Sequence, residues 1–279
     1  MPNIVYLNKK YILFKDAKIP IEDRGFQFSD SVYEVVKVIN KKILDFDFHM
    51  RRLKFSTSEL KFNFKVNSIL LKKIFENLII KNKLSNGIIY FQITRGVQSR
   101  EHAYRKNLKP NIIIYTAKKK FNLPNKNYKG FKAITYPDIR WGRPDIKTTS
   151  LLANIIASTE AKKNGAYETI LVKKKKITEA SHSNVWIVKG KKIITHPANK
   201  EILKGVTRTV LINIIHSLDL KLIEKEFSLK ELYKSDEVFV TSSGSLITPI
   251  IQIDNIKINN KKIGKITKTL ALSFYKSII

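Results

Sequence analysis

Apolar and polar residues alternate along most of the first half of the chain, and this pattern predicts short strands separated by turns. A period of two places successive side chains on opposite faces of a strand. It predicts strands at residues 4–6, 10–14, 32–39, 43–46, 87–94 and 111–116. Apolar residues three and four positions apart predict helices at residues 48–58 and 67–81. The first half is therefore expected to form a mixed domain over residues 1–117.

A second domain is expected after a segment of different composition. Residues 118–130 are basic, contain Pro124 and show no apolar period, so they predict an interdomain linker. Beyond the linker, apolar runs predict strands at residues 131–136, 170–172, 184–188 and 237–241. Helical spacing predicts helices at residues 151–163, 206–218 and about 265–276. We expect two α+β domains, the second over residues 131–279, with a functional site between them.

The bulk composition narrows the class of protein. With 43% hydrophobic residues, a chain of 279 residues can bury the core of one large or two medium domains. No apolar run is long enough to cross a bilayer, and the first residues lack the pattern of a signal peptide. We therefore expect a cytoplasmic protein without a membrane partner. The absence of cysteine excludes disulfides and cysteine-based zinc sites, and we expect no metal site.

The formal net charge of +30 raises the question of nucleic-acid binding. The charge comes mostly from lysines in short runs at expected turns, such as residues 118–120 and 173–176. Arginine, which reads bases and phosphates best, is scarce, and the chain contains no recognisable nucleic-acid-binding motif. We expect no specific nucleic-acid partner, and a polyanion-binding protein stays the remote alternative.

One lysine is distinguished by its position. Lys147 follows an apolar run over residues 131–139 and precedes the helix expected at 151–163, with Thr149 or Ser150 as the expected N-cap. A lysine held between two regular elements is oriented by the backbone on both sides. If it is partly desolvated, its amine can act as a nucleophile. The alternative is a solvated lysine in an ordinary loop.

Several other polar groups have the chemistry of anion or amine binding. Glu179 lies among small polar residues after a strand, where a carboxylate can pair with a protonated ring nitrogen. Two segments offer donors to a phosphate, namely Val206 and Thr207 at a helix start and Ser242 and Ser243 after a strand. The alternatives are a surface glutamate and plain turns.

Three basic side chains complete the set. Arg52, on a predicted helix, can clamp the same phosphate, or it can form a surface ion pair. Arg100 and His102 alternate along a segment expected to be extended, so both can face one carboxylate. The alternative for this pair is an exposed basic loop.

Taken together, these motifs resemble the fold-type IV pyridoxal-phosphate enzymes and, within them, the D-amino acid aminotransferases. The resemblance runs nearly end to end, through segments 22–28, 33–38, 49–53, 94–102, 138–141, 145–147, 178–185, 195–199, 202–208 and 239–243. It implies a small N-terminal α/β domain and a larger, β-rich C-terminal domain with helices. The implied cofactor, pyridoxal 5′-phosphate, would lie between them.

The resemblance also assigns roles to individual residues. It implies that Lys147 holds the cofactor's aldehyde covalently and moves the substrate proton, and that Glu179 pairs with the pyridine nitrogen. The implied phosphate site consists of Arg52, Val206, Thr207, Ser242 and Ser243. The implied trap for the substrate α-carboxylate consists of Tyr33, Arg100 and His102. In the family the Arg and His of this trap come from the neighbouring subunit, so a homodimer is implied.

The implied activity is ping-pong transfer of an amino group from a D-amino acid, such as D-alanine, to 2-oxoglutarate or another 2-oxo acid. The Arg-x-His pair favours D-substrates, because the branched-chain L-specific transaminases and the aminodeoxychorismate lyases share the lysine and the glutamate but are not expected to carry this pair. These two sister activities are the alternatives. The chain departs from the pattern at Ala180, His182 and Gly244.

Overall fold

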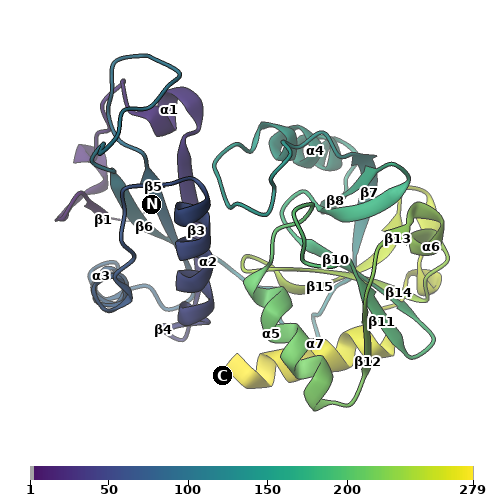
Figure 1. Cartoon of the computed structure of the whole chain (residues 1–279). Coiled ribbons are helices and arrows are strands. Elements are labelled where there is room, and N and C mark those ends of the chain that lie inside the picture. Colours follow the sequence, from purple (N-terminus) through teal and green to yellow (C-terminus); the bar gives the residue numbers. More distant parts are fainter. Residues whose placement is uncertain (1–2, 279) are drawn as a thin grey trace. The chain divides into compact units, whose positions relative to one another are not determined.

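Two β-sheets organise the chain, one in each of two units (Figure 1). The computed structural model describes residues 3–278. The first unit comprises residues 1–120 together with 146–150, and the second comprises 121–145 together with 151–279. The short return of residues 146–150 to the first unit is a feature that the apolar pattern did not indicate. The domain division predicted from the sequence, 1–117 and 131–279 with a linker at 118–130, stays a prediction and differs from these two units in its boundaries.

The first unit contains, among the described residues, a six-stranded sheet in the order β2-β1-β6-β5-β3-β4. All its neighbouring strands are antiparallel. Its strands are β1 (Ile4–Leu7), β2 (Lys10–Leu13), β3 (Ser31–Ile39), β4 (Lys42–Ile43), β5 (Gly87–Thr94) and β6 (Ile112–Lys118). Its helical elements are η1 (Phe14–Asp16), α1 (Arg24–Phe28), α2 (Phe46–Glu59) and α3 (Ser68–Lys81).

Helices α2 and α3 pack on this sheet and close its core. The side chain of Asn67 accepts a hydrogen bond from Leu70 N at 3.0 Å and so caps the start of α3. Along α3, Leu71, Ile74 and Leu78 recur at helical spacing and are at least 96% buried. The predicted strand at 43–46 ends earlier than expected, because α2 already begins at Phe46.

The second unit contains, within residues 3–278, a ten-stranded sheet whose main path is β12-β11-β10-β14-β15-β7-β8-β9-β13, with β16 paired to β15. Its first strands are β7 (Phe131–Pro137), β8 (Glu168–Lys173), β9 (Lys176–Ala180), β10 (Asn184–Lys189) and β11 (Lys192–Thr195). The later strands are β12 (Lys221–Glu224), β13 (Phe227–Ser228), β14 (Glu237–Ser242), β15 (Leu246–Ile253) and β16 (Ile256–Lys257). The helical elements are α4 (Leu152–Lys163), α5 (Val206–Ser217), α6 (Leu229–Tyr233), η2 (Asn259–Lys261) and α7 (Lys265–Ile278).

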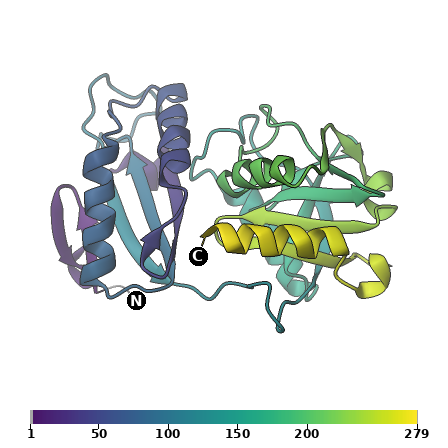
Figure 2. The ribbon, with the colours of Figure 1, turned by 90° about the horizontal axis from the view of Figure 1, so that it is seen from below.

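Helices cover this sheet at two places. Helices α5 and α7 pack on β14 and on each other (Figure 2), and α4 packs on β7 and β8. Most strand pairs are antiparallel, but β7 pairs in parallel with both β8 and β15, and β11 pairs in parallel with β12. The mixed α+β fold predicted from the sequence is confirmed.

The start of α4 differs from the prediction. Neither Thr149 nor Ser150 caps it; Leu151 occupies the N-cap position, without a side-chain cap. The Thr149 hydroxyl instead bonds to Ser31 Oγ and donates to Ser29 O at 3.2 Å. A side chain already bonded to the first unit cannot also cap the helix. Among residues 3–278, no helix has the length and apolar character needed to span a membrane.

Candidate active site

Lys147 is fixed by the backbone of the first unit. Its N–H donates to Ser56 Oγ on α2 at 3.2 Å, and its carbonyl accepts from Tyr33 N on β3 at 3.0 Å. A β-bridge between Val32 and Thr148 adds a further attachment. The side chain is half-buried, and its Nζ lies 4.1 Å from the centre of the Tyr33 ring. The structure thus brings together two of the predicted site residues and orients the amine.

An aromatic row continues from this lysine across the sheet. The rings of Tyr33 and Tyr90 stack at 5.7 Å between centroids, and those of Tyr90 and Tyr115 stack at 4.9 Å. Burial raises the pKa of Tyr90, and the neighbouring phenols add to this effect, so its hydroxyl stays protonated. Sequence reasoning missed Tyr90 and Tyr115, although tyrosines at matching positions of two predicted strands were a usable signal.

Arg52 is held on α2 by a buried carboxylate on β3. Its Nε donates to Glu34 Oε1 at 2.8 Å and its Nη2 donates to Oε2 at 2.7 Å, so the pair is bidentate. His49 Nδ1 lies 2.7 Å from the same Oε2. Burial acts to raise the pKa of Glu34, but Arg52 and His49 outweigh it and lower the pKa to about 2. Sequence reasoning missed Glu34 as the residue that orients Arg52.

Replacing Glu34 with glutamine tests this ion pair through its pH dependence. The lowered pKa means that the folded state favours the carboxylate, so the stabilisation is complete above the ordinary pKa of 4.5 and is lost as the pH falls toward 2. A shift of this size corresponds to about 3 kcal/mol. We expect Glu34→Gln to lower the free energy of unfolding by an amount of this order near neutral pH, and by less as the pH falls.

Urea unfolding of both proteins from about pH 6 to about pH 3 measures this difference. The exposed Glu22 provides the control, because Glu22→Gln is expected to change stability little at any pH. A difference between Glu34→Gln and the parent that stayed constant over this range would contradict the ion pair.

Arg100 and His102 lie in a loop and not in the extended segment that we predicted. Both nevertheless contact one ring: Arg100 Cζ lies 4.8 Å from the Phe28 centroid, and the His102 ring lies 5.5 Å from it. The loop is held by Arg24, whose guanidinium donates to the carbonyls of Glu101 at 2.6 Å and His102 at 2.9 Å. These main-chain bonds replace a strand ladder, which explains why the periodicity misled the prediction.

Glu179 lies in the second unit and is 95% buried. It forms an ion pair with Arg140, accepts from Asn184 Nδ2 at 3.1 Å, and accepts from Leu203 N at 3.2 Å. Burial raises its pKa to about 7, and the attraction of Arg140 only partly opposes this effect. A second positive charge would stabilise the ionised form of this buried carboxyl. A protonated ring nitrogen would supply such a charge.

Arg140 is itself oriented by Asp138. The guanidinium donates to both carboxylate oxygens of Asp138, from Nε at 2.9 Å and from Nη2 at 2.7 Å. The Thr178 hydroxyl donates to the same carboxylate at 2.7 Å. His182, which the sequence suggested as a disturbance near Glu179, instead contacts Ser181 Oγ at 3.0 Å and Glu168 Oε2 at 3.2 Å.

The two expected phosphate segments lie at the same end of neighbouring strands. Asn184, at the start of β10, pairs with Thr241 of β14, and Ser242 and Ser243 follow directly. Asn184 also approaches Gly205, the N-cap of α5, so closely that a Cβ there would lie 2.1 Å from Asn184 Oδ1.

Glycine at position 205 therefore allows the start of α5, with Val206 and Thr207, to lie beside the residues that hold Glu179. The backbone N–H groups at the start of a helix favour an anion. The Ser242 and Ser245 hydroxyls lie 2.7 Å apart in the neighbouring loop and add polar groups at this end of the sheet.

One further group of the second unit has metal-ligand chemistry. Ligand atoms of His196, Glu201 and Glu226 lie within 4.8 Å of one another. Each carboxylate is already paired with a lysine, Glu201 with Lys173 and Glu226 with Lys176. The negative charge that would attract a cation is thus balanced, and we assign no metal to this group.

Comparisons with known proteins identify the family of the chain. The profile of the family described as amino-transferase class IV matches residues 31–253. The chain is 36% identical to the D-alanine aminotransferase of Listeria monocytogenes serotype 1/2a (strain 10403S), over 98% of this chain and 96% of that protein. It is 35% identical to the D-alanine aminotransferase of Staphylococcus aureus (strain MSSA476), over 98% and 97%.

Solved structures of the same fold include branched-chain amino acid aminotransferases. The Escherichia coli enzyme superposes with a TM-score of 0.91 at 22% identity, covering 99% of this chain and 94% of that one. The branched-chain enzyme of Thermobaculum terrenum, solved in its PLP-form, gives 0.89 at 22% identity, with coverage of 99% and 94%. A putative 4-amino-4-deoxychorismate lyase from Legionella pneumophila gives 0.84 at 22% identity, with coverage of 94% and 96%.

Proposed function

Because this chain belongs to the class IV aminotransferases, an enzyme family that uses pyridoxal 5′-phosphate, we propose that it transfers amino groups from D-amino acids such as D-alanine to 2-oxoglutarate or another 2-oxo acid. The observation that carries the proposal is the Arg100–His102 pair on the Phe28 ring, in a chain similar over its whole length to D-alanine aminotransferases. A guanidinium and an imidazole supported by one ring suit a carboxylate.

The residues that the family resemblance implies have the chemistry that the cofactor requires. Lys147, with its backbone pinned and its amine half-buried, would hold the aldehyde carbon. Glu179 would face the ring nitrogen. Arg52 would hold the phosphate together with the helix start at Val206 and Thr207 and the hydroxyls of Ser242 and Ser243, which share one end of the β10–β14 pair.

When bound, the cofactor supplies an electron-accepting ring that stabilises negative charge at the substrate Cα. The remaining chemistry belongs to protein groups. The Nζ of Lys147 would take the proton from the substrate Cα as a base and, as an acid, would give it to the carbon that had carried the cofactor's aldehyde. The carboxylate of Glu179 keeps a proton on the ring nitrogen, and Arg140 and Leu203 N fix that carboxylate in position. Tyr33, Arg100 and His102 bind the substrate carboxylate.

A half-reaction tests the substrate class directly. We expect D-alanine to change the visible absorption of the purified protein and to yield keto acid with 2-oxoglutarate. L-leucine is expected to give a much smaller response. Stronger turnover of L-leucine than of D-alanine would favour the branched-chain alternative, which has support from the fold of the solved structures only. A colourless protein without turnover would contradict the cofactor assignment.

Replacing Arg100 with lysine tests the carboxylate trap. A point charge replaces a planar fork with several donors, so binding of the α-carboxylate weakens. We expect the KM for D-alanine to rise about tenfold or more, with a smaller change in kcat. The neighbouring Arg105→Lys provides the control, because Arg105 is not among the proposed trap residues. An unchanged KM in Arg100→Lys would remove this residue from the trap.

We also propose a homodimer. Helix α4 of the second unit exposes Leu152, Ile155 and Ile156 at 72%, 57% and 41%, a row of apolar side chains suited to a second copy. The family resemblance places Arg100 and His102 at the neighbouring subunit's site. A molar mass in solution near 32.3 kDa, that of one chain, would contradict this proposal. The cytoplasmic location stays an expectation from the sequence.

A further inference from the structure

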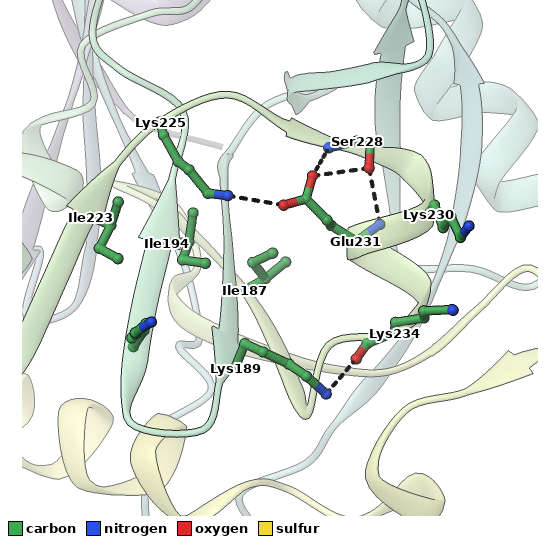
Figure 3. Close-up of a pocket in the computed structure, with 10 residues that line it drawn as sticks. Ile187, Lys189, Ile194, Ile223, Lys225, Ser228, Lys230, Glu231 and Lys234 are labelled. Carbon is green, nitrogen blue, oxygen red and sulfur yellow. Dashed lines mark hydrogen bonds and ion pairs between the residues drawn. The ribbon is translucent and has the colours of Figure 1, made fainter.

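The second unit contains a pocket of about 520 Å³ formed by β10, β11, β12 and the segment around α6. Its volume lies in the range of small-molecule sites. None of its lining residues belongs to the proposed active site. Figure 3 shows Ile187, Ile194 and Ile223 in a row, with Lys225 and Lys189 extending toward the middle of the pocket and Lys230 and Lys234 on the side opposite Ile223.

The apolar side is a row of isoleucines set by strand register. Ile187 of β10 pairs with Ile194 of β11, and Ile194 pairs with Ile223 of β12. The three side chains therefore lie side by side across three neighbouring strands. Ile187 and Ile194 are also members of the buried core of this unit, so the floor that they form is rigid.

The same register places lysines around this floor. Side chains alternate along a strand, so residues two positions apart share a face. Lys189 follows Ile187 by two positions, Lys192 precedes Ile194 by two, and Lys225 follows Ile223 by two. Lys230 and Lys234 line the pocket from the α6 side.

Only part of this charge is balanced within the described residues. The one acidic side chain that lines the pocket, Glu231, accepts from Lys225 at 3.0 Å and from Ser228 N at 2.7 Å. Lys189 pairs with Asp236 at 2.7 Å. Lys192, Lys230 and Lys234 also line the pocket, and the ion pairs found over residues 3–278 include none for these three exposed lysines.

We propose that this pocket binds an organic phosphate whose apolar ring lies on the isoleucine floor and whose negative charges face Lys192, Lys230 and Lys234. Several ammonium point charges suit a group that carries more than one negative charge, as a phosphate chain does. The apolar floor adds affinity that a bare anion cannot obtain. This inference is independent of the proposed aminotransferase reaction, because it uses none of the same residues.

Calorimetric titration tests the proposal with three probes: ATP, tripolyphosphate and adenosine. The protein is first saturated with pyridoxal 5′-phosphate, so that the cofactor's own site is filled. At physiological salt we expect one ATP per chain with a Kd of about 10–100 µM. We expect tripolyphosphate and adenosine to bind at least about tenfold more weakly, because each lacks one half of the required chemistry.

Two matched variants separate this pocket from general attraction to a basic protein. The triple variant K192Q/K230Q/K234Q removes the charges of these three lysines. The control K162Q/K257Q/K268Q removes three exposed lysines elsewhere in the same unit and lowers the net charge by the same amount. We expect the first to weaken ATP binding about tenfold or more and the second to leave it within about twofold. Circular dichroism melting checks that both variants are folded.

A third variant, Ile223→Ser, addresses the floor without changing the charge. It is expected to weaken ATP binding and to leave tripolyphosphate binding unchanged. The proposal is overturned if ATP does not bind, if both triple variants lose binding equally, or if tripolyphosphate binds as tightly as ATP. The last two results would indicate attraction by charge alone.

Discussion

Replacing Lys147 with alanine is expected to reduce turnover of D-alanine by about 10⁴-fold or more, because the lost amine has two proposed roles. The alanine cannot hold the cofactor covalently, and it cannot move the Cα proton. The backbone of Lys147 is fixed by two hydrogen bonds, from its N–H to Ser56 Oγ and from Tyr33 N to its carbonyl, and its amine lies over the Tyr33 ring.

The measurements are the visible spectrum and the steady-state rate, with borohydride reduction and peptide mapping to locate the covalent adduct. Lys54→Ala, on the exposed side of α2, is the matched control and is expected to keep parental activity and colour. Adding a small primary amine is expected to restore part of the rate of Lys147→Ala, since it supplies the missing base. Two results would contradict the assignment of Lys147 as the catalytic lysine: a pyridoxyl adduct on a different lysine, or multiple turnovers by Lys147→Ala without added amine.

Replacing Glu179 with glutamine is expected to lower kcat by roughly 100-fold while the cofactor still binds. Glutamine keeps the shape and still accepts from Leu203 N, but it cannot carry the negative charge that holds a proton on the ring nitrogen. The raised pKa of about 7 shows that burial disfavours this charge in the absence of a further cation. Binding of a protonated ring is therefore expected to favour the ionised carboxylate.

The kinetic isotope effect on removal of the Cα proton separates a role of Glu179 in the reaction from a purely structural role. We expect Glu179→Gln to show a larger kinetic isotope effect with Cα-deuterated D-alanine, because proton removal becomes the slow step. Glu168→Gln is the comparison, since Glu168 is equally buried but bonds to Ser181 and Ser183 and is not assigned to the ring. An unaltered rate and isotope effect in Glu179→Gln would remove this residue from the mechanism.

The confirmed predictions depend on short segments of the chain. Helix α3 could be predicted from the sequence because its N-cap, Asn67, and the apolar residues of its buried face lie within a few residues of one another. The class of enzyme was readable for a similar reason: the residues around Lys147, Glu179, Val206 and Ser242 form short motifs in a fixed order, and the family match over residues 31–253 confirms that reading.

The errors lie where a distant partner competes for a side chain or a backbone group. Thr149 was expected to cap α4, but its hydroxyl bonds to Ser29 and Ser31, more than a hundred residues away. Arg100 and His102 were expected on an extended segment, but Arg24 binds the carbonyls of residues 101 and 102 and shapes a loop. A periodicity cannot report a hydrogen bond that joins residues so far apart in the chain.

The sequence by itself determined the types of most elements, the absence of thiol chemistry and the class of enzyme, because these follow from residue identity and from short motifs in a fixed order. Only the tertiary structure decided which buried charges are paired. It joins Arg52 to Glu34 and Arg140 to both Asp138 and Glu179, and it sets isoleucines and lysines of β10, β11 and β12 side by side. Strand register and burial fix these pairings, and neither is encoded by a local pattern.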